Sequence, residues 1–453
     1  MNKILHRIKG AIALPFFRNT MKLSASTVLL MFIPLFVTPI LSRLYTPEDY
    51  AAWGIFSSTY YIISGFIFLS YENTIVKSNK SEEVPSLVAL CVLVCWFITF
   101  LIAVVFSIGK WASLPFFKDF PSIPLLVVLI LATTTHKLCG AMANREKRYG
   151  MMSVANIVNG SAQAVIRILL GVFPIVSYGL LVGNVTAHAI TALLLLIGLR
   201  DVLFRKDFFA AISWKEIKNL AVKNKKFPLF DMPARLIEFA MANLTLIILS
   251  FFYAKSEIGC YSMVVQFLLV PITMVGTAMA GVFYREISES RADATMVTLT
   301  TRRAAKITFF ISVLPALFLS LGGDKLLVII LGDKWIEAGP MALCLAVYSI
   351  PLILSEPLLP VFRALDRQEV RFKWNLINLI CSFSALIAAA FFVKDLYLVL
   401  IAYSICYGAV RFCMYFQVLR LADVKLNTVS PFFIPVIVGT YLLLVIRLVV
   451  SVL

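Results

Sequence analysis

The sequence predicts an all-α polytopic membrane protein with about thirteen transmembrane helices, arranged as two six-helix lobes around a central cavity plus one extra C-terminal helix. The chain has 453 residues, of which 61% are hydrophobic and 14% are charged. Soluble domains are roughly half apolar and about one quarter charged, so a soluble core cannot hide this much apolar surface. Many windows of at least about 18 residues are almost free of charge and are long enough to cross a bilayer.

Each expected span is an apolar run bounded by polar or charged residues. The first six are Leu23–Leu41, Ala52–Glu72, Val84–Ile108, Ile123–Ala143, Met151–Phe173 and Tyr178–Leu199. The other seven are Met232–Tyr253, Gly259–Tyr284, Ala304–Leu321, Ala338–Phe362, Trp374–Val393, Leu396–Leu419 and Phe432–Val452. The basic segment before them, residues 1–22, is expected to be an amphipathic arm at the membrane surface.

Lysine and arginine are unevenly distributed between the spans. The net charge is +17, and about 29 of the 41 basic residues fall in alternate segments that begin with the N-terminal arm, against about 8 in the opposite segments. Basic loops remain in the cytosol, which predicts a cytosolic N-terminus and a C-terminus outside. Because this excess of charge follows the loops, it indicates membrane orientation, and we expect no nucleic-acid partner.

The expected domains follow from the longest basic loop. Residues 23–199 form the N-lobe, 200–230 a basic cytosolic linker, 231–420 the C-lobe and 421–453 the additional helix. The sequence Leu-Ser-Arg-Leu-Tyr at 41–45, followed by Glu48, Asp49 and Trp53, is partly repeated 208 residues later at 249–253, followed by Glu257 and Tyr261. An even number of spans per lobe predicts parallel pseudo-repeats related by an axis along the membrane normal.

Familiar catalytic patterns are missing from the sequence. It contains no Gly-x-x-x-x-Gly-Lys phosphate loop, no Gly-x-Ser-x-Gly elbow and no His-Glu-x-x-His. The eight cysteines lie mostly in expected spans, and Cys91 and Cys95 lack zinc-site spacing. We therefore expect no enzyme activity, no catalytic residue, no bound metal and no organic cofactor.

The fifth span carries a polar stripe. At 100° per residue, the offsets of Asn156, Asn159, Gln163 and Arg167 place all four on one helix face. One interpretation is a cavity wall that offers amides to sugar hydroxyls and a guanidinium to a phosphate. The other is hydrogen bonding that holds helices together.

Neighbouring spans add further embedded polar groups. Lys137 and His136 lie on the fourth span, and His188 shares a face of the sixth with Asn184. Lys137 and His188 are candidate substrate contacts, although Lys137 is also close enough to the cytosolic interface to snorkel. For each histidine, packing and proton relay are alternative interpretations that the sequence does not separate.

Acidic residues suggest coupling or gating. Asp231, Arg235 and Glu238 can meet on one face of the seventh span, either as an internal ion pair or as a site where Arg235 exchanges a carboxylate for an anionic substrate. Glu72 ends the second span, and Glu356 lies among Pro351, Pro357 and Pro360, which should bend the tenth. We assign Glu72, Asp231, Glu238 and Glu356 to coupling or gating, and Arg235 to substrate binding.

The twelfth span places Tyr403, Tyr407 and Arg411 at four-residue steps. This pattern favours sugar stacking beside a phosphate-binding cation, with helix packing and a snorkelling arginine as the alternative. Embedded Lys137, Arg167, Arg235 and Arg411 together indicate an anionic substrate. Na⁺ or H⁺ remains open as a coupling ion.

Several segments resemble the bacterial polysaccharide repeat-unit flippases of the O-antigen translocase (Wzx) type, within the multidrug, oligosaccharidyl-lipid and polysaccharide (MOP) exporter superfamily. They are residues 42–50 (SRLYTPEDY), 71–76 (YENTIV), 227–233 (FPLFDMP), 257–262 (EIGCYS), Pro271 and 331–339 (LGDKWIEAG). They occur in the family's order over most of the chain. The chain departs from the family at Tyr50-Ala51, where Phe-Gly is usual, and in its odd thirteenth span.

The resemblance implies twelve core helices that alternate between inward- and outward-open states in the bacterial inner membrane. It implies transport of an undecaprenyl-diphosphate-linked oligosaccharide, such as an O-antigen unit for lipopolysaccharide biosynthesis, to the outer leaflet. Expected partners are this lipid-linked oligosaccharide, membrane lipids, a polysaccharide polymerase and a chain-length regulator, and the C-terminus is expected in the periplasm.

Two other functions compete with this interpretation. A drug or metabolite exporter of the same superfamily would share the fold, but cationic drugs favour acidic cavity residues and the embedded charges here are mainly basic. A membrane polysaccharide polymerase or acyltransferase would need a large outward loop with catalytic groups, whereas the longest outward segments, 109–122 and 322–337, are short.

Overall fold

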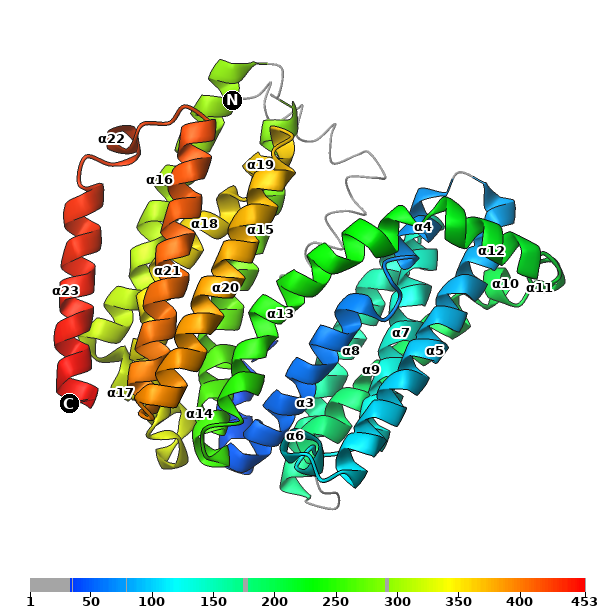
Figure 1. Ribbon diagram of the computed structural model, residues 1–453, viewed down its shortest axis with the longest axis horizontal. Helices are drawn as coiled ribbons and strands as arrows, with labels where there is room; N and C mark the ends of the chain where they lie inside the picture. The colour runs from blue at the N-terminus through cyan, green and yellow to red at the C-terminus, as the bar shows by residue number, and fades with distance from the viewer. Residues whose placement is uncertain (1–32, 35, 79, 174–177, 290–292, 453) are drawn as a thin grey trace. The chain divides into compact units, whose positions relative to one another are not determined.

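The computed structural model describes residues 33–452 except 35, 79, 174–177 and 290–292. Over these residues the chain is a set of long α-helices joined by short turns (Figure 1). Ten of the described helices are long and apolar enough to cross a membrane. The all-α polytopic fold class is therefore confirmed, while the total of thirteen spans stays a prediction.

The chain divides into two compact units. Unit 1 comprises the residues up to Tyr45 together with Ala52–Asn243, and unit 2 comprises Thr46–Ala51 and Leu244–Leu453. The helices of the first part of the chain are α3 (Pro47–Phe66), α4 (Glu72–Lys77), α5 (Val84–Trp111), α6 (Pro115–Lys118), α7 (Ile123–Arg145), α8 (Tyr149–Val172), α9 (Gly179–Gly198), α10 (Arg200–Leu203), α11 (Lys206–Ala210), α12 (Trp214–Lys223) and α13 (Met232–Leu249). A 3₁₀ turn, Ser81–Glu83, precedes α5, and a π-turn, Phe227–Asp231, precedes α13.

Unit 2 contains the second long series of helices. They are α14 (Lys255–Val264), α15 (Val270–Glu289), α16 (Ala294–Phe318), α17 (Asp324–Leu331), α18 (Ala338–Ser355), α19 (Pro360–Ala364), α20 (Gln368–Phe392), α21 (Leu396–Leu421), α22 (Leu426–Val429) and α23 (Phe433–Val452). In the span Ala338–Ala364, 89% of the most apolar window is buried, against 11% in Tyr149–Val172. Helix α18 is thus the centre of unit 2, and it packs against α16, α21 and α23.

Most expected spans coincide with helices, but the second does not end where the hydropathy suggested. The expected span Ala52–Glu72 stops at Phe66, and a turn with positive φ at Leu69 and Ser70 leads into α4, which begins at Glu72. Because the turn residues are themselves mostly apolar, hydropathy alone cannot detect this break. The expected span Leu23–Leu41 and the arm 1–22 lie wholly or mostly outside the described residues.

The tenth span, which was expected to bend at its prolines, is interrupted near Pro357, whereas Pro351 lies within α18. Helix α18 ends at Ser355, Glu356–Leu358 form a 3₁₀ turn and α19 starts at Pro360. Proline lacks the N–H needed to continue the α-helical ladder, so closely spaced prolines favour such a break. Glu356 therefore lies at a helix discontinuity.

The two expected repeats begin with the same hydrogen bond. The backbone N–H of Thr46 donates to Asp49 Oδ2 (2.9 Å), and the N–H of Asp49 donates to Thr46 Oγ1 (3.3 Å), which caps α3. At the corresponding positions, the N–H of Ala254 donates to Glu257 Oε2 (2.9 Å) at the start of α14. Recurrence of this contact at an interval of 208 residues supports the internal repeat.

Gly259 is required by a close backbone approach in unit 2. A Cβ at this position would lie 1.7 Å from the carbonyl oxygen of Pro47. We expect Gly259→Ala to destabilise unit 2 by more than about 3 kcal/mol, because backbone atoms cannot move aside as side chains do. The measurement is the yield of monodisperse protein on detergent size-exclusion chromatography.

The matched control for this substitution is Gly281→Ala on α15, where a Cβ would meet nothing within 4 Å. Alanine is the better helix former, so this variant should give the wild-type profile. A wild-type profile for Gly259→Ala as well would show that the two backbones are not held together in the folded protein.

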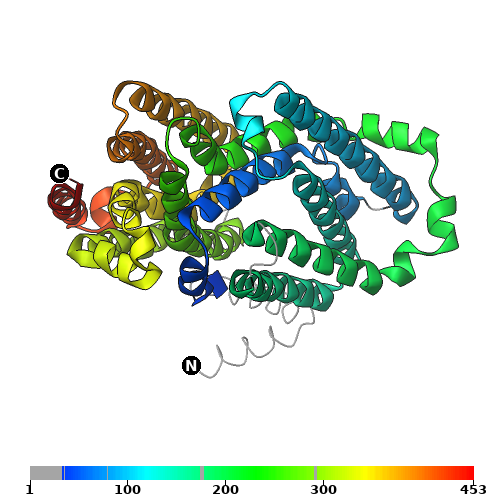
Figure 2. The ribbon, with the colours of Figure 1, turned by 90° about the horizontal axis from the view of Figure 1, so that it is seen from below.

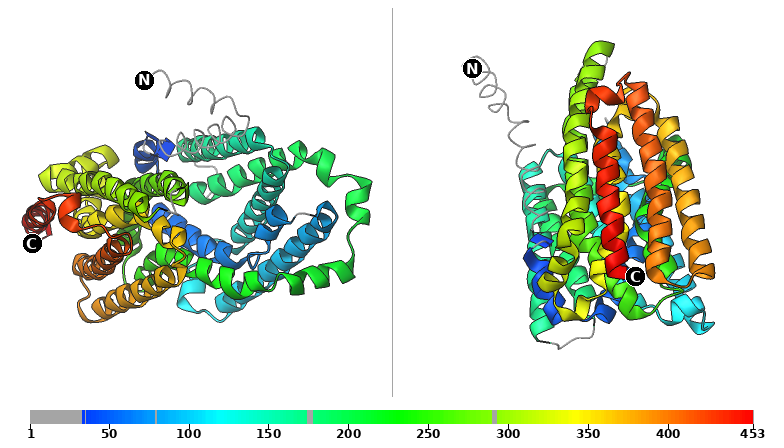
Figure 3. Two further views of the ribbon diagram at one scale, coloured as in Figure 1. Left: turned by 90° about the horizontal axis from the view of Figure 1, so that it is seen from above. Right: turned by 90° about the vertical axis from the view of Figure 1, so that its left-hand side faces the viewer.

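Helix α23 is attached to unit 2 by specific polar contacts. Tyr441 donates a hydrogen bond to the carbonyl of Val347 on α18 (2.7 Å), and Arg447 forms an ion pair with Asp324 (2.8 Å). Figure 2 shows α23 (dark red) at the edge of unit 2, and the right-hand view of Figure 3 shows it alongside α16. Its outer face carries exposed aliphatic residues suited to lipid, for example Ile446 and Val450.

Candidate functional site

A hydrogen-bonded polar chain crosses from α8 to α9 in unit 1. Gln163 donates from Nε2 to Asn159 Oδ1 (2.8 Å), and Asn159 Nδ2 lies 3.2 Å from both His188 Nδ1 and Thr191 Oγ1. The sequence placed Asn159 and Gln163 on one face, and the structure shows that this face meets α9. Part of the stripe therefore holds helices together, as the alternative interpretation proposed.

The polar chain continues onto α7. The rings of His188 and His136 lie 5.8 Å apart. Lys137, the next residue, is half-buried and close enough to Arg235 and Glu72 for their charges to act on it. Five helices of unit 1 thus contribute to a single polar region, which we call the polar track: Gln163, Asn159, His188, His136, Lys137, Arg235 and Glu72.

Arg167 lies one helical turn beyond Gln163 and is only 6% exposed. Its guanidinium carbon lies 5.1 Å from the ring centroid of Trp53, a cation–π arrangement. Helix α9 approaches closely because residue 183 is glycine: a Cβ there would lie 2.6 Å from Arg167 Cγ. Tyr45 donates to the backbone carbonyl of Arg167 (2.8 Å), so both its side chain and its backbone are held in position.

Helices α4 and α13 are joined by two polar contacts. Arg235 forms an ion pair with Glu72, and Asn73 Nδ2 donates to Asp231 Oδ2 (3.1 Å). The side chains of Arg235 and Glu72 are 31% and 13% exposed, so the pair is only partly shielded from solvent. The spacing of Asp231, Arg235 and Glu238 did not reveal these contacts, because their partners lie far away in the sequence.

The predicted aromatic residues of unit 2 form a cluster with Tyr348 of α18. The ring of Tyr348 lies 4.9 Å from that of Tyr407 and 6.1 Å from that of Tyr403. Tyr403 is 4% exposed and accepts a hydrogen bond from Thr245 (3.2 Å). This environment of Tyr403 fits helix packing better than sugar stacking.

Arg411 forms an ion pair with Glu356. Arg411 Nη1 lies 3.1 Å from Glu356 Oε2, and Arg411 Nη2 donates to the hydroxyl of Tyr407 (2.9 Å). Gly276 on α15 leaves room for Glu356, since a Cβ there would lie 3.2 Å from its Cγ. The sequence analysis identified Arg411 and Glu356 separately and did not predict that they form a pair. In the structure, Glu356 already neutralises the charge of Arg411.

Two other candidates lie on the helices where the sequence places them. Asn156 is half-buried on α8, and Glu238 is exposed on α13. Sequence reasoning did not identify Trp53 as the partner of Arg167. It also missed Tyr348 and the Asp324–Arg447 pair. An embedded acid and an embedded base in otherwise apolar helices were the available signal for that pair. Over the described part of the chain, no group of three or more His, Cys, Asp or Glu side chains is placed to hold a metal ion.

The fold of the chain is similar to that of several solved membrane transporters. The structure is similar to lipid II flippase MurJ in an inward closed conformation (TM-score 0.70, 10% identity, covering 95% of this chain and 96% of that one). It is also similar to an inward-facing multidrug resistance MATE family transporter (TM-score 0.65, 11% identity, 87% and 95% covered). A third similar structure is a MOP superfamily transporter from Pyrococcus furiosus (TM-score 0.59, 13% identity, 89% and 95% covered).

The sequence itself identifies the family. Residues 40–340 match the profile of the polysaccharide biosynthesis protein family, and the chain belongs to that family. It is 22% identical over 149 residues to the teichuronic acid biosynthesis protein TuaB of Bacillus subtilis (strain 168), a match that covers 33% of this chain and 31% of that protein. The resemblance inferred from the motifs is thereby confirmed for a polysaccharide biosynthesis family and for the fold, while the O-antigen (Wzx) type stays a prediction.

Proposed function

We propose that this protein is a flippase that moves an undecaprenyl-diphosphate-linked oligosaccharide from the cytosolic to the outer leaflet of a bacterial inner membrane by alternating access. Family membership supports a role in polysaccharide biosynthesis, and the fold supports membrane transport. The O-antigen unit is our preferred cargo. The basic loops support a cytosolic N-terminus and a periplasmic C-terminus.

The observation that carries this proposal is the excess of positive charge around the polar track. Lys137, Arg167 and Arg235 are all embedded in unit 1, where Arg235 pairs with Glu72. Embedded cations are costly unless they meet an anion, and a diphosphate supplies one. The amides of Asn156, Asn159 and Gln163 are suited to sugar hydroxyls.

The same observation argues against a drug exporter as the second candidate, because a cationic drug would be repelled by these three groups. Transport of a diphosphate outward would be assisted by an inside-negative potential, by about 2.3 kcal/mol per charge per 100 mV. We further propose that Na⁺ or H⁺ exchange at Glu72, Asp231, Glu238 or Glu356 provides any additional coupling. A polymerase and a chain-length regulator would act on the delivered units.

The test uses a strain that lacks the gene. Lipid-linked oligosaccharides are extracted from spheroplasts before and after treatment with periodate, which oxidises only sugars that it can reach from outside. We expect the deletion to leave complete units protected, wild-type protein to expose them, and Arg167→Ala to reduce exposure by roughly tenfold or more, since a charged hydrogen bond contributes about 1.5 to 3 kcal/mol.

Lys118→Ala is the matched control, since Lys118 is an exposed cation on α6 outside the track. Immunoblots must show equal amounts of each variant in the membrane. Exposed but unpolymerised units in the deletion strain would support a polymerase instead. An unchanged lipid pool would contradict the oligosaccharide substrate and favour a small-molecule exporter.

A further inference from the structure

A cavity of about 370 Å³ lies inside unit 1, apart from the polar track. Helices α5, α7 and α9 and the segment 203–209 form its walls, and none of the track residues lines it. Representative lining residues are Val92, Trp96, Leu138, Leu196, Phe204 and Phe208. Figure 2 and the left view of Figure 3 show the α10–α12 segment (green) as an arc at this edge of unit 1.

The lining of this cavity is suited to hydrocarbon. Its two threonines, Thr134 and Thr135, donate their hydroxyls to the carbonyls of Ile130 and Leu131 on their own helix (both 2.7 Å). Their methyl groups remain to contact a ligand, alongside aromatic and aliphatic side chains. A polar molecule would lose hydrogen bonds to water on entering, whereas a lipid chain would not.

The segment beside the cavity has the character of a helix that lies on a membrane surface. Phe204, Phe209 and Trp214 are 65%, 57% and 72% exposed, while Ile217 and Leu220 of α12 are buried against unit 1. Exposed aromatic residues beside exposed basic ones are typical of segments at the boundary between headgroups and acyl chains.

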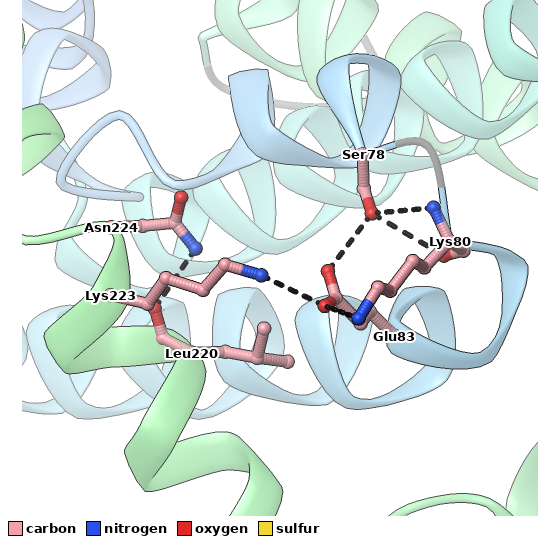
Figure 4. A network of polar contacts seen from close by, with 6 residues as sticks. All are labelled: Ser78, Lys80, Glu83, Leu220, Lys223 and Asn224. Carbon is pink, nitrogen blue, oxygen red and sulfur yellow. Dashed lines mark hydrogen bonds and ion pairs between the residues drawn. The ribbon is translucent and has the colours of Figure 1, made fainter.

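Side-chain contacts fix this segment in place. Glu83 receives Lys223 Nζ at 2.8 Å and the hydroxyl of Ser78 at 3.1 Å (Figure 4). Tyr71 donates to the carbonyl of Ala221 on α12 (3.1 Å). The wall of the cavity is therefore a docked part of unit 1, and a preformed site lowers the entropic cost of binding a ligand.

Positive charge flanks the same wall. Arg200 and Arg205 are exposed and lie close in sequence to the lining residues Leu203 and Phe204. Neither forms an ion pair within the described part of the chain. Arg148, by contrast, is paired with Asp201 and holds the pKa of that carboxyl below its usual range. Arg205 also acts electrostatically on Asp201. Two exposed cations thus flank the cavity wall, where an anionic headgroup would lie.

We propose that this cavity binds an acyl chain of an anionic membrane phospholipid, whose headgroup lies at Arg200 and Arg205. The lipid is a resident of the fold and differs from the transported substrate, because the cavity shares no residue with the polar track. Its binding combines burial of the chain with the attraction of two basic side chains for a negative headgroup.

The experiment uses purified full-length protein in nanodiscs that contain phosphatidylglycerol with a photoactivatable acyl chain, and maps the labelled peptides by mass spectrometry. We expect labels on residues 131–142 of α7. Val92→Trp, which fills the cavity, should reduce this labelling by at least about fivefold, since packed volume excludes the chain. Leu193→Trp, on an exposed site of α9 outside the lining, should leave it unchanged.

The headgroup is tested separately. The double variant Arg200→Gln and Arg205→Gln keeps the apolar lining and should reduce labelling by roughly thirtyfold, at about 1 kcal/mol per basic residue. Equal labelling by phosphatidylethanolamine, or no labelling of α7 in the wild type, would overturn the proposal. Preferential labelling by a photoactivatable polyprenyl diphosphate that displaces phosphatidylglycerol would overturn it too, and would assign the cavity to the substrate.

Discussion

Replacement of Arg447 by alanine is expected to destabilise unit 2 by roughly 3 to 5 kcal/mol, because it leaves a buried carboxylate without its cation. Asp324 has only 5% of its side chain exposed, and Arg447 donates to both of its oxygens at 2.8 and 3.0 Å. The hydroxyl of Ser451 adds a bond of 3.3 Å. The measurement is the unfolding midpoint of the purified protein in detergent.

Two further variants make this prediction specific. Arg420→Ala removes an exposed arginine of unit 2 and should leave the midpoint unchanged. The double variant Asp324→Leu and Arg447→Met removes both charges and should recover most of the lost stability, since apolar replacement of a buried pair is often neutral or stabilising. If Arg447→Ala behaved like Arg420→Ala, α23 would not depend on this pair for its attachment.

The Asp324–Arg447 pair also changes the interpretation of the last helix. From hydropathy, residues 421–453 were expected to add one span to a twelve-helix core, and α23 is long and apolar enough for that. The ion pair and the Tyr441 hydrogen bond show that it is built into unit 2. A helix held only by lipid would not need an arginine at this depth.

Local sequence rules predicted local structure well. Thr46, Pro47 and Asp49 start α3 as a helix cap should, and Pro351, Pro357 and Pro360 accompany the break beyond α18. The break at Leu69 and Ser70 was missed because it depends on backbone conformation within an apolar run. Hydropathy measures transfer into lipid and is insensitive to such a turn.

The candidate site was predictable as a set of residues but not as a set of contacts. Helical periodicity placed Asn159 and Gln163 on one face, and that much follows from a single helix. The partners of Arg235 and Arg411, Glu72 and Glu356, lie 163 and 55 residues away, so only the packed fold brings them together. Embedded charges indicate that partners exist without identifying them.

The affinity for the substrate is expected to change in opposite directions when Arg235 or Glu72 is replaced by neutral glutamine. If the diphosphate of the substrate replaces Glu72 at Arg235, then Arg235→Gln removes the binding cation and should weaken binding of undecaprenyl diphosphate by roughly tenfold to a hundredfold. Glu72→Gln removes the competing carboxylate and should strengthen binding by roughly tenfold, since like charges beside the site oppose the anion. Binding is measured on purified protein in nanodiscs.

The transport assay gives a second, independent readout of this exchange. Glu72→Gln should slow transport even though it binds more tightly, because a substrate that is no longer displaced by the carboxylate leaves more slowly. Glu82→Gln is the control, because Glu82 is an exposed acid of unit 1 outside the pair. Should Glu72→Gln weaken binding as much as Arg235→Gln does, the ion pair would be a structural link between α4 and α13. Opposite changes in affinity would instead identify Glu72 as the group that releases the substrate.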